Sequence, residues 1–156
     1  MELSERLQII IPIAWAVLAV VGRWLLFRKA GKPGWHSIIP ILSDYDEFAI
    51  CWRGGKYFLS LILSFIGIGC GKMVEDKTIL TGLIGNNAAQ VEQVSTILLI
   101  VGGLALLWVL IIHLRQSVKL ARSFDRGLLV GLLLFLFDRI GRVILGLGPA
   151  KYVGKS

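Results

Sequence analysis

The chain has 156 residues, a length that suits one domain. Hydrophobic residues make up 56% of it and charged residues only 17%, against about 45–50% and about 25% in soluble domains. This composition, with a mean hydropathy of +0.77, argues against a disordered tail, a disulfide-rich secreted scaffold or an ordinary cytosolic enzyme. The net charge of +7 is typical of cytoplasmic loops in a membrane protein. We expect an integral membrane protein.

Four apolar runs are long enough to cross a bilayer, which takes about 20 residues of helix. They cover residues 7–27, 56–74, 94–114 and 127–148. We therefore expect an all-α membrane protein with four transmembrane helices, forming a single membrane domain over residues 1–156. The chain starts with more acidic than basic residues, unlike the positive start of a signal peptide, so the first helix should be retained.

The segment between the first two runs is too apolar for a simple linker and too interrupted to span, because Pro33 and Pro40 break any long helix. Ser43 or Asp44 can cap a new helix, with an acidic residue three positions on. Its apolar residues then fall on one stripe, and its charged residues cover the remaining surface. The stripe consists of Tyr45, Phe48, Ala49 and Trp52. These features predict a short interfacial helix over about 43–53.

Small residues recur at helical spacing in two of the predicted spans. Ser60, Ser64, Gly67 and Gly71 share one face of the second span, and the fourth span repeats the pattern with Gly127 and Gly131. Such faces let helix backbones approach closely in lipid. They predict helix packing, within one protomer more than between two copies of the chain.

A basic stripe follows the third span, where the helix is expected to continue. Its members, spaced to share one helix face, are Arg115, Lys119, Arg122 and Arg126. The stripe predicts contact with anionic lipid headgroups. The alternative is a solvated face that is basic only because cytoplasmic loops are basic. If the stripe lies on the same side as the interfacial helix, its bases should meet Asp44, Asp46 and Glu47.

Orientation follows from the basic residues of the short loops. The first and third loops with their flanks hold ten Lys and Arg, whereas the second holds only Lys72 and Lys77. This distribution predicts a multi-pass cell-membrane protein with loops one and three in the cytoplasm and both termini outside. Lys151 and Lys155 count against the predicted place of the C-terminus.

The fourth span contains charges that ordinary membrane helices avoid. Asp138 and Arg142 stand four residues apart and can pair, and on one continuous helix they share a face with the two glycines. We expect an intramembrane ion pair that holds helix register, with a transport role as the less favoured hypothesis. Arg139 needs another partner or a route to the interface. A break at Gly141 into a re-entrant pair is the third possibility.

Two segments resemble the opening and closing motifs of a family of small multi-pass bacterial membrane proteins of unknown function. They are AGKPGWHSIIPILSDYDEFAICW and KLARSFDRG followed by GLGPAKYVGK, and together they cover about residues 30–155. The resemblance implies a membrane fold and carries over no catalytic residue. Some relatives are labelled signal peptidases, but we find no Ser–Lys pair for that chemistry at the outer face. Relatives usually have an apolar, Pro-containing stretch where this chain has Asp138 to Arg142.

No motif predicts chemistry. The histidines and carboxylates lack HExxH spacing, and two cysteines cannot form a disulfide framework, so we expect no catalytic residues, metal or cofactor. The leading hypothesis is a non-enzymatic accessory or scaffold protein that acts through helix packing and lipid contact. A small oligomeric channel or transporter using the charged span is second, and an enzyme acting on lipid or membrane-protein substrates is third. Expected partners are anionic lipids and a second copy or another membrane protein, but no nucleic acid.

Overall fold

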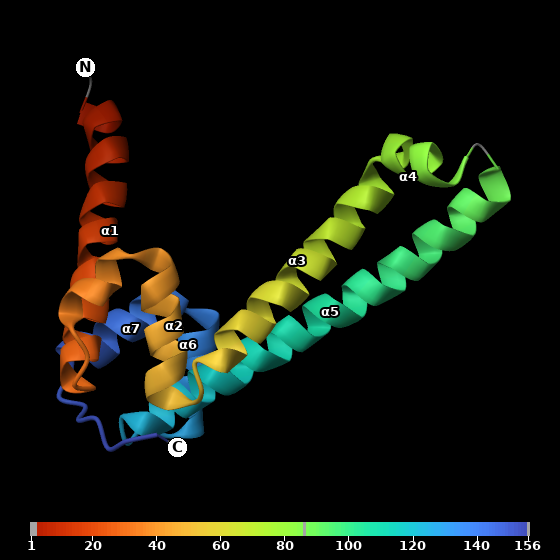
Figure 1. Cartoon of the computed structure of the whole chain (residues 1–156). Helices are drawn as coiled ribbons and strands as arrows, with labels where there is room; N and C mark the ends of the chain where they lie inside the picture. Colours follow the sequence, from red (N-terminus) through yellow and green to blue (C-terminus); the bar gives the residue numbers. More distant parts are fainter. Residues whose placement is uncertain (1–2, 86, 156) are drawn as a thin grey trace. The chain divides into compact units, whose positions relative to one another are not determined.

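The computed structural model describes residues 3–85 and 87–155, and every regular element in them is helical. In chain order the elements are α1 (Leu3–Lys29), η1 (Gly34–Ile38), α2 (Pro40–Cys51), α3 (Gly55–Glu75), α4 (Lys77–Ile84), α5 (Ala88–Ser123), α6 (Leu128–Leu136) and α7 (Asp138–Leu147) (Figure 1). The chain forms two compact units. The terminal unit contains the residues up to Tyr57 and from Leu114 onward, and the hairpin unit contains Phe58–His113.

Three helices, α1, α3 and α5, are long and apolar enough to cross a membrane. At most 17% of the apolar window of each is buried in the protein, which leaves most of their apolar side chains available to lipid. The first three predicted spans are therefore confirmed as long apolar helices. The helix is also continuous beyond the third span, because α5 runs on to Ser123.

The prediction of a fourth transmembrane helix is wrong. The segment breaks at Phe137, whose backbone leaves the helical region (φ −119°, ψ 54°), and yields helices of 9 and 10 residues, each well short of the roughly 20 that a span needs. The break precedes Asp138 and does not fall at Gly141. A Cβ on Gly141 would lie 2.6 Å from Leu134 Cδ2, so α7 packs closely against α6.

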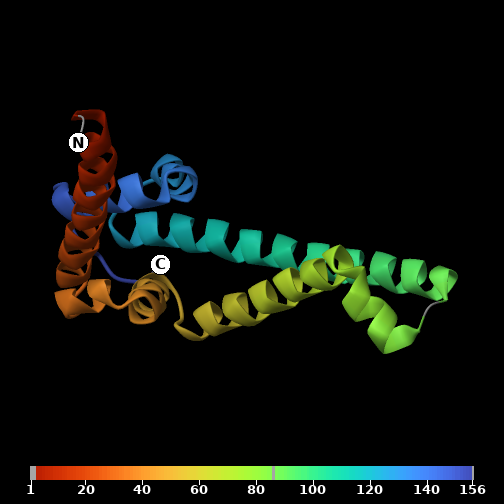
Figure 2. The same cartoon turned by 90° about the horizontal axis from the view of Figure 1, so that it is seen from above.

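The break has a physical reason in the pattern of α7. Arg142, Val143, Leu145 and Gly146 are buried on one side of this helix, while Asp138 and Arg139 are exposed. The other side of α7 exposes Ile140, Ile144 and Leu147, so this amphipathic helix turns Arg142 and Gly146 toward the protein and most of its apolar side chains outward. The buried side of α7 packs against α1, which α7 crosses (Figure 2).

The core of the terminal unit joins segments that are far apart in the sequence. It consists of Leu26, Phe27, Ile50, Cys51, Leu120, Ala121, Phe124, Leu134, Leu145 and Ala150. The C-terminal segment is tied to this core by two hydrogen bonds. Tyr152 Oη donates to the Ile50 carbonyl at 2.8 Å, and Val153 N donates to the Ser123 carbonyl at 2.8 Å.

The connection after α1 explains part of the opening motif. Gly31 adopts a left-handed conformation (φ +71°), and Lys32 N donates to the Phe27 carbonyl at 2.9 Å, an arrangement that ends helices and favours glycine. Gly34 lies against Trp24, where a Cβ would meet the indole nitrogen at 2.5 Å. The two glycines thus serve a sharp turn and a close contact.

The helix predicted over about 43–53 exists as α2, but its start and its charged surface were predicted wrongly. It begins at Pro40, with Ile39 as the N-cap and no side-chain cap from Ser43 or Asp44. Proline suits the first helical position because that N–H has no partner within the helix. Asp46 and Glu47, expected at the surface, are 2% and 1% exposed.

The hairpin unit is simpler. In both views α3 and the first part of α5 lie side by side and antiparallel, with α4 between them in sequence (Figures 1 and 2). The helices meet at small residues: a Cβ on Gly67 would meet Leu106 at 2.6 Å, and one on Gly102 would meet Cys70 at 2.9 Å. α4, which the sequence did not predict, is capped by Asp76, whose side chain accepts from Thr78 N at 3.1 Å.

Candidate functional site

A buried carboxylate holds the terminal unit together. Glu47 of α2 accepts from Arg142 Nε of α7, which lies 2.8 Å from Oε1 and 2.7 Å from Oε2. Gln116 Nε2 of α5 donates to Oε1 at 2.7 Å, and Arg23 Nε of α1 lies 3.9 Å from Oε2. Four helices therefore meet at one charged group, and breaking such a buried pair is strongly destabilising.

The structure brings Asp138 and Arg142 together, since Arg142 Nη1 donates to Asp138 Oδ2. The two ends of this pair differ, because the Asp138 side chain is 54% exposed and the Arg142 side chain 10%. Burial alone would lower the pKa of Arg142, but the carboxylates of Glu47 and Asp138 raise it, so the guanidinium stays charged. The contact with Glu47 was missed in the sequence, where 95 residues separate the two.

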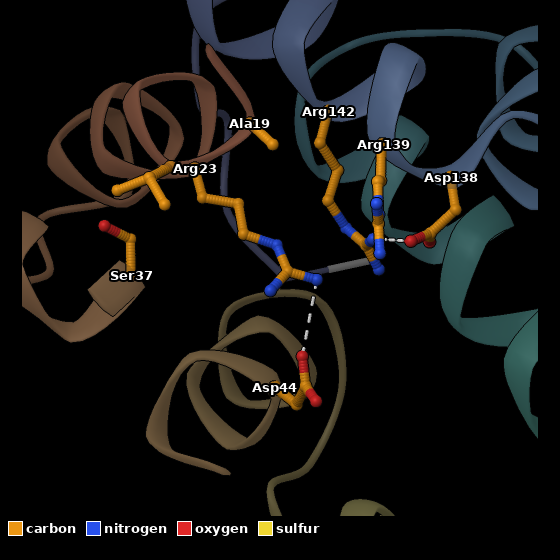
Figure 3. Close-up of a pocket in the computed structure, with 8 residues that line it drawn as sticks. Ala19, Arg23, Ser37, Asp44, Asp138, Arg139 and Arg142 are labelled. Carbon is orange, nitrogen blue, oxygen red and sulfur yellow. Dashed lines mark hydrogen bonds and ion pairs between the residues drawn. The ribbon is translucent and has the colours of Figure 1, made fainter. Parts of the chain in front are cut away.

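The charged residues of α1, α2 and α7 also surround a cavity of about 240 Å³. Figure 3 shows the arginines of α1 and α7 reaching toward the same space. The lining residues are Ala19, Val20, Arg23, Ser37, Asp44, Asp138, Arg139 and Arg142. We call this cavity the arginine pocket.

Two of the three arginines in the pocket, Arg23 and Arg139, make only long contacts or none with the described residues. Arg23 Nη2 lies 3.4 Å from Asp44 Oδ1, and Nη1 donates to Ser43 Oγ at 3.2 Å, both longer than the roughly 2.7–2.9 Å of strong charge-assisted bonds. Arg139 is exposed, and no ion pair or hydrogen bond of its guanidinium is found within the described residues. Burial raises the pKa of Asp44 despite the nearby Arg23.

A second carboxylate of α2, Asp46, has partners that are not among the residues lining the pocket. Asp46 pairs with Lys32 Nζ at 3.0 Å and with His36 Nδ1. Burial alone would raise the pKa of Asp46, but the hydrogen bonds from His36 and Lys32 outweigh burial and lower it. In the described part of the chain no three His, Cys, Asp or Glu side chains gather in a way that suits a metal ion.

The ion pairs of Asp44, Asp46 and Glu47 thus lead to Arg23, Lys32, His36 and Arg142. The sequence pattern had connected these carboxylates with the basic stripe. It could not identify the actual bases, because they lie on α1, on the following turn and on α7 rather than on the amphipathic face of α5.

Three members of the predicted basic stripe, Arg115, Lys119 and Arg122, lie at the end of α5 beside Trp52. The prediction of one helix face is wrong for Arg126, because α5 ends at Ser123. Arg115, Arg122 and Arg126 are exposed, and Lys119 Nζ lies 5.7 Å from the centre of the Trp52 ring. Three stripe residues border a groove of about 320 Å³ with both polar and apolar walls. Its lining residues are Trp52, Leu114, Arg115, Val118, Lys119 and Arg122.

The predicted small residues behave differently from one another. Gly67 and Gly131 contact neighbouring helices, Gly131 through Val118 of α5, whereas Gly71 and Gly127 face open space. Ser60 is buried, and its carbonyl accepts from Ser64 Oγ at 2.8 Å. Because Gly127 precedes α6 and Asp138 begins α7, the expected common face of Gly127, Gly131, Asp138 and Arg142 on one helix does not exist.

The tightest helix contact involves glycines that the sequence analysis did not select. A Cβ on Gly146 of α7 would lie 2.1 Å from the Gly22 carbonyl oxygen of α1. A Cβ on Gly22 would lie 2.7 Å from Val143 Cα. Lys29 strengthens the same contact, because its Nζ donates to the Leu145 and Gly148 carbonyls at 2.9 and 2.6 Å and so caps the end of α7.

Comparison of the chain with family models, curated proteins and solved structures finds no match.

Proposed function

We propose that this chain is a three-span membrane protein that works as a non-enzymatic accessory or scaffold protein, with loop one, the end of α5 and the segment after α5 on the cytoplasmic side. The observation that carries the proposal is the packing of loop one against the C-terminal segment. Tyr152 bonds to Ile50, and Arg142 bonds to Glu47. Segments that pack directly against each other must lie on the same side of the membrane.

This topology also accounts for the charges better than four spans do. With three spans, the basic residues of loop one, the stripe and the C-terminus share one side, and that side is cytoplasmic by the positive-inside rule. Lys151 and Lys155, which contradicted the four-span arrangement, now agree with it. The N-terminus stays outside, and the prediction of an outside C-terminus is replaced.

The scaffold role rests on the way the charged groups are used. Glu47, Arg142, Asp46 and Lys32 pair with one another or with neighbours inside the protein, which stabilises a fixed shape more than it prepares a reaction. The groove beside the stripe offers exposed bases and a tryptophan, a combination typical of contact with anionic headgroups at a membrane surface. The channel hypothesis loses its premise, because it depended on charges within a fourth span.

Topology is tested by cysteine labelling of intact cells with a membrane-impermeant maleimide. In a Cys70→Ala background, Lys77→Cys should be labelled from outside, and Lys151→Cys only after permeabilisation. Cys51 is buried and needs no replacement. Labelling of Lys151→Cys in intact cells would contradict the three-span topology.

Lipid contact is tested by native mass spectrometry of protein extracted from membranes that contain anionic phospholipid. Replacing Arg115, Lys119 and Arg122 together by glutamine should weaken the binding of anionic lipid about a hundredfold, because each base contributes about 1 kcal/mol to that binding. The control replaces Lys72, near the end of α3, and Lys77, at the start of α4. Equal losses in both variants would contradict the stripe as the contact surface.

A further inference from the structure

We propose that the arginine pocket binds the phosphate group of a membrane phospholipid, with Arg23 and Arg139 as its principal ligands. The inference deepens the lipid contact proposed above, and rests on the proposed function in placing the chain in a membrane. It does not depend on the basic stripe, which lies on a different helix. The ligand chemistry follows from the groups that line the cavity.

The first argument is unused donor capacity. A guanidinium carries five N–H donors and matches phosphate oxygens in pairs. Arg142 already donates hydrogen bonds to Glu47 and Asp138. Arg23 has only long contacts, at 3.2–3.9 Å, with Ser43, Asp44 and Glu47. No partner of Arg139 is found in the described parts of the chain. Two guanidiniums with free donors thus border a cavity of about 240 Å³ (Figure 3), enough for a phosphate.

The second argument is a buried hydroxyl that lacks a partner. Ser37 is 6% exposed and lines the pocket, and its Oγ has no hydrogen-bond partner among the described residues. A buried hydroxyl without a hydrogen bond is costly. A ligand oxygen beside η1 within hydrogen-bond distance of this Oγ would supply the missing partner.

The third argument is the position of the pocket along α1. Arg23 lies six residues before the end of this membrane-spanning helix, about 9 Å along its axis, a depth that suits a headgroup phosphate. Ile13, Val17 and Val20 share one face of α1 and are exposed, and Val20 also lines the pocket. A phospholipid can place its acyl chains along that face while its phosphate enters the pocket. A free phosphate ion would leave this apolar face of α1 without a ligand contact.

Asp44 limits how tightly the pocket holds an anion. Its carboxylate borders the cavity and repels a second negative charge, and burial already makes it easier to protonate than an ordinary aspartate by raising its pKa. A phosphate beside it favours the neutral form further. Asp44→Asn should therefore strengthen binding, an effect opposite to that of losing an arginine.

The test measures lipid binding to the purified full-length protein by native mass spectrometry, with phosphatidic acid as the probe and phosphatidylcholine as competitor. Arg139→Gln should lower phosphatidic acid binding about tenfold or more, the usual loss for one charged hydrogen-bond pair. Asp44→Asn should raise it severalfold. Arg28→Gln is the matched control, since Arg28 is an exposed arginine on α1 outside the pocket.

The remaining outcomes are decisive as well. Equal losses in Arg139→Gln and Arg28→Gln would overturn the site and leave only general attraction between charges. Inorganic phosphate that displaces phosphatidic acid at millimolar concentration would confirm the phosphate pocket and overturn the lipid as its natural ligand. Loss of binding in the stripe variant with normal binding in Arg139→Gln would overturn this inference while the proposed function stands.

Discussion

The two units of this protein are stabilised in contrasting ways. The hairpin unit joins two apolar helices through small residues, such as Gly67 against Leu106 and Gly102 against Cys70. The terminal unit adds a buried ion network in which Glu47 is 1% exposed. Lipid tails are as apolar as the side chains of a spanning helix, so burying these side chains in protein gives little hydrophobic free energy. Helices in lipid therefore associate through close packing and polar contacts. Where segments leave the membrane, a charged centre can select one arrangement among many.

The largest expected effect tests that charged centre. Glu47→Gln leaves the buried Arg142 without its main counter-charge and should lower the free energy of unfolding by about 3–5 kcal/mol. Asp138→Asn is the matched control, because it removes the other, exposed partner of Arg142 and should cost at most about 1 kcal/mol. Denaturant titration in detergent micelles measures both. Similar losses in the two variants would show that Glu47 has no special role.

A double replacement sharpens this prediction. Glu47→Leu together with Arg142→Leu removes both charges and should recover much of the stability that either single change loses, since apolar pairs often replace buried ion pairs without loss. Failure to recover would indicate that Gln116, left without its acceptor, contributes more than the ion pair. The same denaturant titration decides between these outcomes.

The next effect concerns close backbone contact. Gly146→Val places atoms where the Gly22 carbonyl oxygen lies, and overpacking of this kind should cost about 1–3 kcal/mol. Gly67→Val in the hairpin unit should cost less, because the side chain of Leu106 can move whereas a backbone carbonyl cannot. Gly69 faces open space and provides the control. Thermal melts in detergent rank the three variants, and an equal effect at Gly69 would contradict the packing account.

A smaller effect is the pH dependence of stability, which should differ between Asp46 and Asp44 of α2. The pKa of Asp46 is lowered in the folded protein, so this group stabilises the fold above the pKa of the unfolded chain, about 4. That contribution is lost as the pH falls through the lower folded value. Asp46→Asn should reduce stability at pH 7 and flatten the acid limb of a stability–pH profile.

Asp44 should behave in the opposite way, because its pKa is raised in the folded protein. Its ionised form is less favourable in the folded state than in the unfolded chain, so Asp44→Asn should leave stability at pH 7 unchanged or slightly higher. Denaturation at a series of pH values compares the two variants. A loss of stability in Asp44→Asn equal to that in Asp46→Asn would contradict the assignment.

The smallest effect is at a turn. Asp125 follows α5 with a left-handed backbone (φ 55°), a conformation that costs a non-glycine residue about 1 kcal/mol or more. Asp125→Gly should therefore raise stability by up to about 1 kcal/mol, with Asp125→Asn closer to the wild type. A shift in the thermal midpoint measures this. Lower stability of the glycine variant would show that the carboxylate of Asp125 makes a contact that matters.

The sequence by itself determined the three long spans. Their length and apolar composition are local properties, and a bilayer requires every backbone group of a spanning segment to be satisfied within that segment. Hydropathy and helical periodicity therefore suffice for α1, α3 and α5. The same local rules also predicted a helix after Pro40 and the continuation of α5 beyond residue 114, although the first turn of α2 was misplaced.

Only the tertiary structure decided the end of the chain and the candidate site. Residues 127–148 have the apolar content of a span, but α7 gains more by packing Gly146 against Gly22 and by pairing Arg142 with Glu47. Both partners lie about a hundred residues away in the sequence, and no local pattern records such a pairing. The arginine pocket is likewise assembled from α1, α2 and α7. A site of this kind exists only once distant helices have met, because the side chains that line it come from segments far apart in the sequence.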